Sequence, residues 1–192
     1  MKKGFTIKSL LILVAVITCF AAFAFPRYFW EKEKARALAV DAVLSDAEIA
    51  QDYFMRLHGR FAADWAALAR YFSVPSILNV TAQEVGGTPA ELYLAFIGPN
   101  GKPEADGYIL RLEQAPSAEE PARLAARRVG GRYNYQLVRP MFTGQTVCQG
   151  QDERGNKFCS LFAPYLQREH IRFISKPFSS EKPASPASAV KK

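Results

Sequence analysis

The segment that decides the fold is Lys2–Trp30, which reads KKGFTIKSLLILVAVITCFAAFAFPRYFW. Within it lies an apolar run, Leu10–Phe25, that is sixteen residues long and interrupted only by Thr18. A helix needs about 20 apolar residues to cross a bilayer, and Phe29 and Trp30 extend this run at the far interface, where aromatic side chains accumulate. Because lysines precede the run, the positive-inside rule predicts a cytoplasmic N-terminus and an extracytoplasmic remainder.

Three interpretations compete for this segment. In the first it is a secretory signal peptide, with the small-residue triplet Ala22–Ala24 as its cleavage site. In the second it is an uncleaved signal anchor. The third rests on Gly4, Phe5 and Thr6, which stand between the N-terminal charges and the apolar run. Neither of the first two interpretations requires that arrangement.

Two short motifs flank the apolar run. The first is Lys2-Lys3-Gly4-Phe5-Thr6-Ile7 and the second is Pro26-Arg27-Tyr28. With them, residues 1–58 resemble the type IV pilin and type II secretion pseudopilin family, whose members open with a basic leader, Gly, Phe-Thr and an apolar helix kinked by proline. The resemblance implies that a prepilin peptidase cuts after Gly4 and N-methylates Phe5. Cleavage there leaves the apolar helix in the chain, whereas a signal peptidase would remove it.

Ser9 departs from the family pattern, which has a glutamate four residues after the cleaved phenylalanine. In a fibre that carboxylate can offset the N-terminal ammonium of a neighbouring subunit in apolar surroundings, and a serine hydroxyl carries no such charge. A subunit at the tip has no neighbour above it whose amine needs neutralising. Ser9 therefore favours a minor or tip subunit, and the alternative is a tolerated variation in an ordinary subunit.

The helix is predicted to continue through residues 31–58, because no Gly or Pro occurs between Pro26 and Gly59. Pro26 removes a backbone donor and should kink the helix. Apolar residues recur with a period near 3.6, which predicts one packed face. That face is expected to contain Ala35, Leu38, Ala42, Ile49, Tyr53 and Leu57, with Val43, Ala47, Ala50 and Phe54 beside them.

Beyond this helix the pattern predicts a head of the α+β class. Asp64 is placed to cap a short helix with Trp65 in the core. Strands are expected at 92–97, 108–112 and 133–138. The turns between them include all of residues 117–132, and short connections favour an antiparallel sheet packed on the long helix.

The chain is therefore expected to divide into five parts. These are a leader at 1–4, a transmembrane and assembly helix at 5–30, its amphipathic continuation at 31–58, a globular head at 59–178 and a flexible tail at 179–192. The tail is assigned by composition, because SSEKPASPASAVKK has almost no apolar residues.

Cys148 and Cys159 stand in VCQGQDERGNKFC and are predicted to form a disulfide, which persists outside the cytoplasm. Closing so short a loop contributes about 3 kcal/mol in the chain-entropy account. The intervening Asp-Glu-Arg-Gly-Asn indicates a polar turn, and Cys19 in the apolar run indicates a small packing residue. Two thiols spaced this widely do not make a zinc site, and neither histidine stands beside a nucleophile. No enzyme activity, metal or cofactor is predicted.

Charge is uneven along the chain. Residues 1–122 hold 12 basic and 14 acidic residues, whereas residues 123–192 hold 13 and 4. Arginines and tyrosines that alternate can track a phosphate backbone and stack bases, but solvated faces and surfaces that dock an acidic neighbour look the same. The candidates for contact with an anion or nucleic acid are Arg123, Arg127, Arg128, Arg132, Tyr133, Tyr135 and Arg139.

These observations predict a structural, non-enzymatic subunit of a type IV pilus or a type II secretion pseudopilus. The resemblance implies three kinds of partner: other pilin or pseudopilin subunits, the prepilin peptidase and an inner-membrane assembly platform. It implies a single-pass subunit of the bacterial inner membrane with a periplasmic head, which later joins a fibre. Relatives of the family include subunits of DNA-uptake fibres, so a competence pilus subunit that contacts DNA is one alternative. A secreted soluble binding protein is another.

Overall fold

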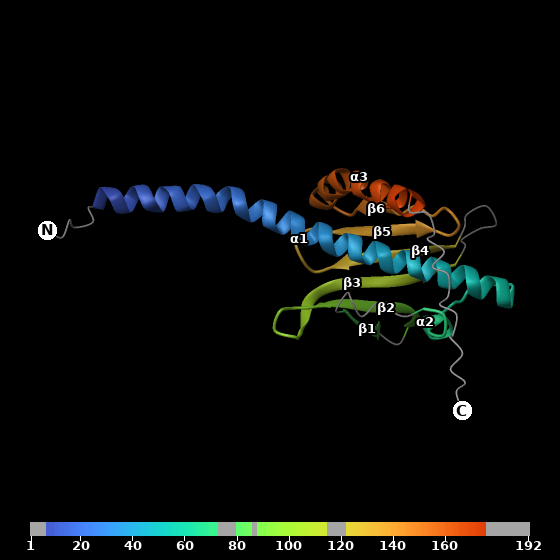
Figure 1. Cartoon of the computed structure of the whole chain (residues 1–192). Helices are drawn as coiled ribbons and strands as arrows, with labels where there is room; N and C mark the ends of the chain where they lie inside the picture. The colour runs from blue at the N-terminus through green and yellow to red at the C-terminus, as the bar shows by residue number, and fades with distance from the viewer. Residues whose placement is uncertain (1–6, 73–79, 86–87, 115–121, 176–192) are drawn as a thin grey trace, which may run out of the picture.

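The computed structural model describes residues 7–72, 80–85, 88–114 and 122–175, with side chains described within 7–72, 90–114 and 122–166. A long helix projects from one end of a head that contains an antiparallel sheet and a second long helix (Figure 1). Helices and strands are segregated along the chain, so the predicted α+β class is confirmed. The Gly4–Phe5 junction and the tail 179–192 lie outside the described residues.

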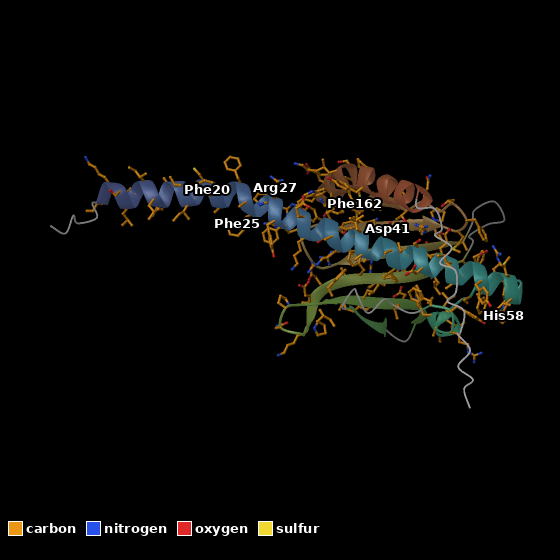
Figure 2. All side chains as sticks on the ribbon, in the orientation of Figure 1. Phe20, Phe25, Arg27, Asp41, His58 and Phe162 are labelled. Carbon is orange, nitrogen blue, oxygen red and sulfur yellow. A yellow bond between two sulfur atoms is a disulfide. The ribbon has the colours of Figure 1, made fainter. Side chains whose placement is uncertain are left out.

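The projecting helix, α1, spans Ile7–His58 without a break. Pro26 lies inside it, and the helix axis changes direction near the labelled Phe25 and Arg27 (Figure 2). The helix ends at Gly59, whose φ of 70° is a left-handed conformation that glycine adopts without strain. The Gly59 amide donates to a carbonyl oxygen of the last turn at 2.8 Å, which satisfies one of the acceptors that a helix end leaves open.

The buried face of α1 differs from the predicted face. Ile49, Tyr53 and Leu57 are 66%, 53% and 55% exposed, and Ala35 and Ala42 are exposed as well. The prediction is confirmed for Val43, Ala47, Ala50 and Phe54, which are buried. The same face also contains Ala37, Val40 and Leu44, which were not predicted. The prediction is wrong for the exposed residues because the helix has two apolar stripes, and periodicity does not tell which one the sheet covers.

The sheet has six strands in the order β1-β2-β3-β4-β5-β6, and each strand pairs antiparallel with the next one in the sequence. The strands are β1 (Val80–Val85), β2 (Thr88–Ile97), β3 (Pro103–Glu113), β4 (Arg123–Val129), β5 (Tyr135–Pro140) and β6 (Val147–Gly150). The three predicted strands correspond to β2, β3 and β5. The two edge strands, β1 and β6, were not predicted.

Strand β4 corrects the predicted connection at 117–132. It pairs with β3 and β5 and so lies inside the sheet. Leu124, Ala126 and Arg128 alternate along it and are buried. The arginines between the apolar residues made the segment look like a polar linker, although its period of two is that of a strand.

A long helix, α3 (Glu153–Ser175), stands where the sequence predicts a polar turn. Asp152 precedes it, and Asp152 Oδ1 accepts a hydrogen bond from the Gly155 amide at 2.6 Å, which is the contact of an N-cap. Phe158 and Phe162 lie one turn apart on the helix and are fully buried. The turn prediction is wrong because Asp, Gly and Asn favour turns and helix starts alike, and the apolar stripe that follows decides for the helix.

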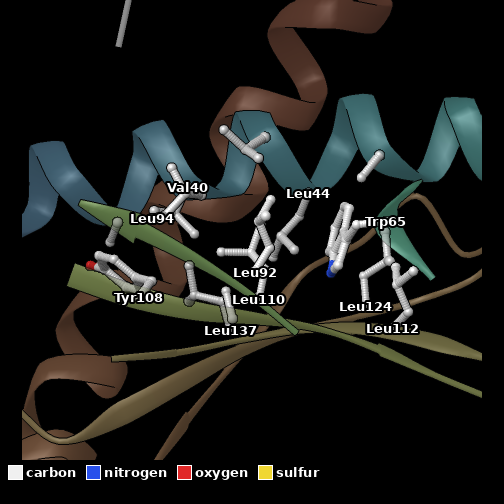
Figure 3. Packing of buried hydrophobic residues seen from close by; sticks show 14 of the residues in the cluster. Val40, Leu44, Trp65, Leu92, Leu94, Tyr108, Leu110, Leu112, Leu124 and Leu137 are labelled. Atoms are coloured by element: carbon white, nitrogen blue, oxygen red, sulfur yellow. The ribbon is translucent and has the colours of Figure 1, made fainter. Parts of the chain in front are cut away.

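The short helix α2 (Trp65–Leu68) confirms the predicted cap, since Asp64 Oδ1 accepts from the Ala67 amide at 2.6 Å. Trp65 is buried in the core that lies between α1 and the sheet (Figure 3). The labelled residues of this core are Val40, Leu44, Trp65, Leu92, Leu94, Tyr108, Leu110, Leu112, Leu124 and Leu137. The second half of α1 is thus an integral part of the head.

Candidate functional site

The first half of α1, residues 7–29, projects away from the head (Figure 1). Within the described part of the chain, α1 is the one helix long and apolar enough to cross a membrane, and none of its most apolar 18-residue window is buried. The Thr18 hydroxyl donates to the Val14 carbonyl oxygen at 2.8 Å, so this donor is satisfied within the helix itself. Cys19 is a free, exposed thiol and Ser9 lies exposed near the start of the helix.

A buried charge cluster fixes the second half of α1 to the sheet. Glu33 is only 5% exposed. Its carboxylate accepts hydrogen bonds from Arg128 Nε at 2.6 Å and Nη2 at 3.1 Å. It also accepts from the hydroxyl of Tyr135 at 2.8 Å and that of Tyr108 at 3.3 Å. We call this group the Glu33 cluster; it comprises Glu33, Arg36, Glu104, Asp106, Tyr108, Arg128 and Tyr135.

Arg128 is the centre of the Glu33 cluster. Besides the two bonds to Glu33, its Nη2 donates to Asp106 Oδ2 at 2.5 Å. Its Nη1 donates to the carbonyl oxygens of Gly107 at 3.0 Å and Val129 at 2.9 Å. All five N–H groups of the guanidinium therefore have an acceptor, which is the condition under which a buried charge is tolerated.

Arg36 extends the cluster along α1. Its Nη1 donates to Asp106 Oδ2 at 2.7 Å, and its Nη2 forms an ion pair with Glu104. Lys32, on the same helix, reaches Glu104 at 3.1 Å in a more exposed position. The cluster thus joins α1 to β3 through both Arg36 and Glu33.

The surroundings shift the pKa values of four members of the cluster. Burial and the charge of Glu33 raise the pKa of Tyr108, and burial and the neighbouring Tyr108 raise the pKa of Tyr135. Burial would raise the pKa of Asp106, but Arg128 and Arg36 outweigh it and the net pKa lies below the ordinary 3.8. Burial would lower the pKa of Arg128, but Glu33 raises it. These pKa shifts keep Asp106 and Arg128 charged and both tyrosines protonated near neutrality.

A second attachment lies further along α1. Arg139 Nε donates to Glu48 Oε2 at 2.5 Å, and Glu48 Oε1 accepts from the Phe142 amide at 2.9 Å. The Gln51 side chain accepts from the Ala62 amide at 2.9 Å and donates to the Ala62 carbonyl oxygen at 3.1 Å. The helix is therefore held by polar contacts at intervals along its buried face.

Three of the residues predicted to contact an anion or nucleic acid are not accessible. Arg128, Arg139 and Tyr135 are buried against α1. The prediction is corrected for these three because the carboxylates of Glu33 and Glu48 occupy the two arginines. Sequence reasoning missed both glutamates. A signal was present, since Glu33 stands one turn before the buried stripe of α1, where an acidic residue needs a buried partner.

The remaining candidates are exposed or half-buried. Arg127, Arg132 and Tyr133 line one open cleft of about 720 Å³. The same cleft includes Asp152, Glu153 and Arg154. Arg123, at the other end of β4, is exposed and pairs with Glu113 at 2.5 Å. The structure therefore brings together only part of the predicted basic surface.

Cys148 and Cys159 form a disulfide, as predicted. The bridge joins edge strand β6 to α3. Within the described ranges, no group of three or more His, Cys, Asp or Glu residues is placed to hold a metal ion. Comparisons of the chain with protein-family models, with curated proteins and with solved structures find no match.

Proposed function

We propose that this chain is a structural, non-enzymatic subunit of a type IV pilus or a type II secretion pseudopilus. The observation that carries the proposal is the uncovered half of α1, where eleven large apolar side chains between Ile7 and Phe25 are exposed. Each such side chain gains about 1.5–3 kcal/mol when it leaves water. Lipid, and later the helices of neighbouring subunits, must therefore cover this segment.

The joint between the two halves of α1 supports the same proposal. A subunit that is drawn out of the bilayer by its helix must carry its head along, so the head has to be fixed to that helix. The Glu33 cluster provides this attachment directly after the apolar segment. The partners we propose are other pilin or pseudopilin subunits, the prepilin peptidase and the inner-membrane assembly platform, with the head in the periplasm.

Mass spectrometry of the mature protein tests the proposal. Protein purified from membranes should begin at Phe5 and carry one additional methyl group on its amine. Substituting Gly4→Leu should leave the leader attached, because the resemblance places the cut after Gly4. A mature protein that begins at Phe25 would identify a secreted soluble protein and contradict the proposal.

The position of the subunit within the fibre follows from Ser9. We propose a minor or tip subunit, because a tip subunit needs no carboxylate at this position. The abundance of the chain in sheared fibres should be low relative to the main subunit. If the chain proved the most abundant component and Ser9→Glu left its incorporation unchanged, the minor-subunit proposal would be wrong.

A competence pilus subunit that contacts DNA is the second candidate. The cleft that contains Arg127, Arg132 and Tyr133 is the observation that favours it. Contacts with phosphates predict an affinity that falls steeply with salt. A salt titration of DNA binding by the full chain in detergent, compared between the native protein and R127Q/R132Q, tests this candidate.

A further inference from the structure

The end of the head from which α1 projects carries exposed arginines. The Arg132 guanidinium lies 4.4 Å from the centre of the Phe29 ring. Arg132 lines the same cleft as Arg127 and Arg154, and all three are exposed. None of the three forms an ion pair with another described residue. Arg27, exposed on α1, lies just outside the head (Figure 2).

Arg132 lies at the depth of lipid phosphates when the apolar run spans the hydrocarbon layer, and Arg127 and Arg154 line the same cleft. Phe29 follows Phe25, the end of that run, by four residues, which is about 6 Å along a helix. Each headgroup layer of a bilayer is about 5–7 Å thick. Because Arg132 lies over Phe29, its charge falls within that layer.

The aromatic side chains next to Phe29 are also of the types found at membrane interfaces. Trp30 packs on Phe158 with ring centres 5.0 Å apart, and Tyr133 packs on the same ring at 5.1 Å. Aromatic residues of this kind concentrate at membrane interfaces. Two carboxylates, Asp152 and Glu153, share the cleft, and Asp152 is occupied as the cap of α3. The arginines outnumber these two carboxylates.

We infer that the inserted subunit docks its head on anionic lipid through a surface defined as Arg27, Arg127, Arg132 and Arg154. The inference rests on the proposed membrane insertion of α1. Guanidinium groups bind phosphates through paired hydrogen bonds, and basic residues next to a membrane helix are attracted to anionic headgroups. Docking holds the head against the bilayer before assembly and is released when the subunit is extracted.

Amide hydrogen exchange of the full chain in lipid nanodiscs tests the inference. The discs contain either phosphatidylcholine alone or phosphatidylcholine with one quarter phosphatidylglycerol. Exchange in the loop 130–134 should slow by at least about fivefold in the anionic discs, since a single basic residue near an anionic surface gives an effect of roughly that size. High salt should remove the difference because it screens the attraction.

A matched pair of variants assigns the effect to this surface. R127Q/R132Q/R154Q should remove most of the difference between the two kinds of disc, because Arg27 is then the one arginine of the surface that remains. R60Q/R70Q/R123Q removes the same number of exposed arginines from elsewhere on the protein and should keep the native response. Unchanged exchange within β3, which contains no substituted residue, shows that both variants remain folded.

The outcomes separate the two proposals. Protection of residues 10–25 in both lipids, together with equal exchange of the loop in both, overturns docking and leaves membrane insertion standing. Rapid exchange of residues 10–25 overturns insertion, and docking with it. Slower exchange of the loop with a DNA oligonucleotide but not with anionic lipid overturns docking in favour of nucleic-acid contact.

Discussion

Residues 7–29 and 30–58 belong to one continuous helix, yet their surroundings are opposite. The first half exposes large apolar side chains and projects away from the head (Figure 1), and Arg132 of the head reaches it at Phe29. The second half packs on the sheet and buries Glu33 and Arg36 together with its apolar stripe. The same backbone conformation therefore presents an uncovered apolar surface in one half and packs into a mixed protein core in the other.

The difference shows that side chains, and not helicity, assign each half to its environment. The run Leu10–Phe25 has no charged residue, so lipid or another apolar helix can cover it. The buried Glu33 carboxylate needs hydrogen-bond donors, because an unpaired buried carboxylate is costly. The folded sheet supplies these donors from Arg128 and Tyr135. The change from the uncharged apolar run to the half that buries charged side chains occurs within two turns of Pro26.

The largest expected effect is the loss of the buried carboxylate. Glu33→Ala removes the carboxylate to which two N–H groups of buried Arg128 and the Tyr135 hydroxyl donate, and should destabilise the head by about 3–5 kcal/mol. Glu31→Ala, which removes an exposed partner of Lys34, should cost about 0.5 kcal/mol or less. Urea unfolding of the full chain in detergent measures both. Equal losses in the two variants would show that the cluster does not hold the head on α1.

A pair of identical substitutions compares the two halves directly. Ile17 and Ile49 are 58% and 66% exposed on the same helix. Ile17→Asp should weaken membrane insertion by about 3 kcal/mol, because it places a carboxylate near the centre of the apolar run. Ile49→Asp should leave insertion unchanged. The fraction of protein retained by membranes after alkaline extraction measures the effect, and equal retention of the two variants would contradict a membrane role for the first half.

A smaller effect is expected at the start of α3, which covers Trp30 at the junction of the two halves. Asp152→Ala removes the N-cap and should cost about 1 kcal/mol of head stability. Asp152→Asn keeps an acceptor and should cost much less. Thermal unfolding followed by near-ultraviolet circular dichroism distinguishes the two variants, and a loss of equal size in both would assign the effect to charge and not to capping.

Near neutrality, a change of pH should have the smallest effect on stability. Only the stability of the head should respond. The lowered pKa of Asp106 contributes stability that is present above 3.8 and is lost as pH falls through its folded value. The raised pKa values of Tyr108 and Tyr135 contribute stability that is full below 10.0 and is lost as pH rises further. Stability should therefore be flat between these limits. Phenolate absorbance should show two tyrosines that ionise only when the head unfolds.

Local chemistry was enough to predict several parts of the molecule. The apolar run, the helix that ends at His58, the Asp64 cap and the Cys148–Cys159 bridge each depend on neighbouring residues or on a short spacing. Membrane processing at Gly4 and Phe5 stays a prediction, since both lie outside the described residues. Strand β4 was missed because its arginines hide the alternation of buried and exposed residues. Helix α3 was missed because it begins with residues that also favour turns.

By itself, the sequence determined that one long helix has an uncharged apolar half and a head-supporting half, because the composition of consecutive residues changes between the two halves. Only the tertiary structure decided which stripe of the second half is buried and which arginines are accessible. Glu33 and Arg128 are 95 residues apart in the chain and meet at 2.6 Å. Arg128 and Arg139, which look like part of a nucleic-acid surface in sequence, therefore form internal ion pairs, because burial and pairing depend on contacts between distant segments.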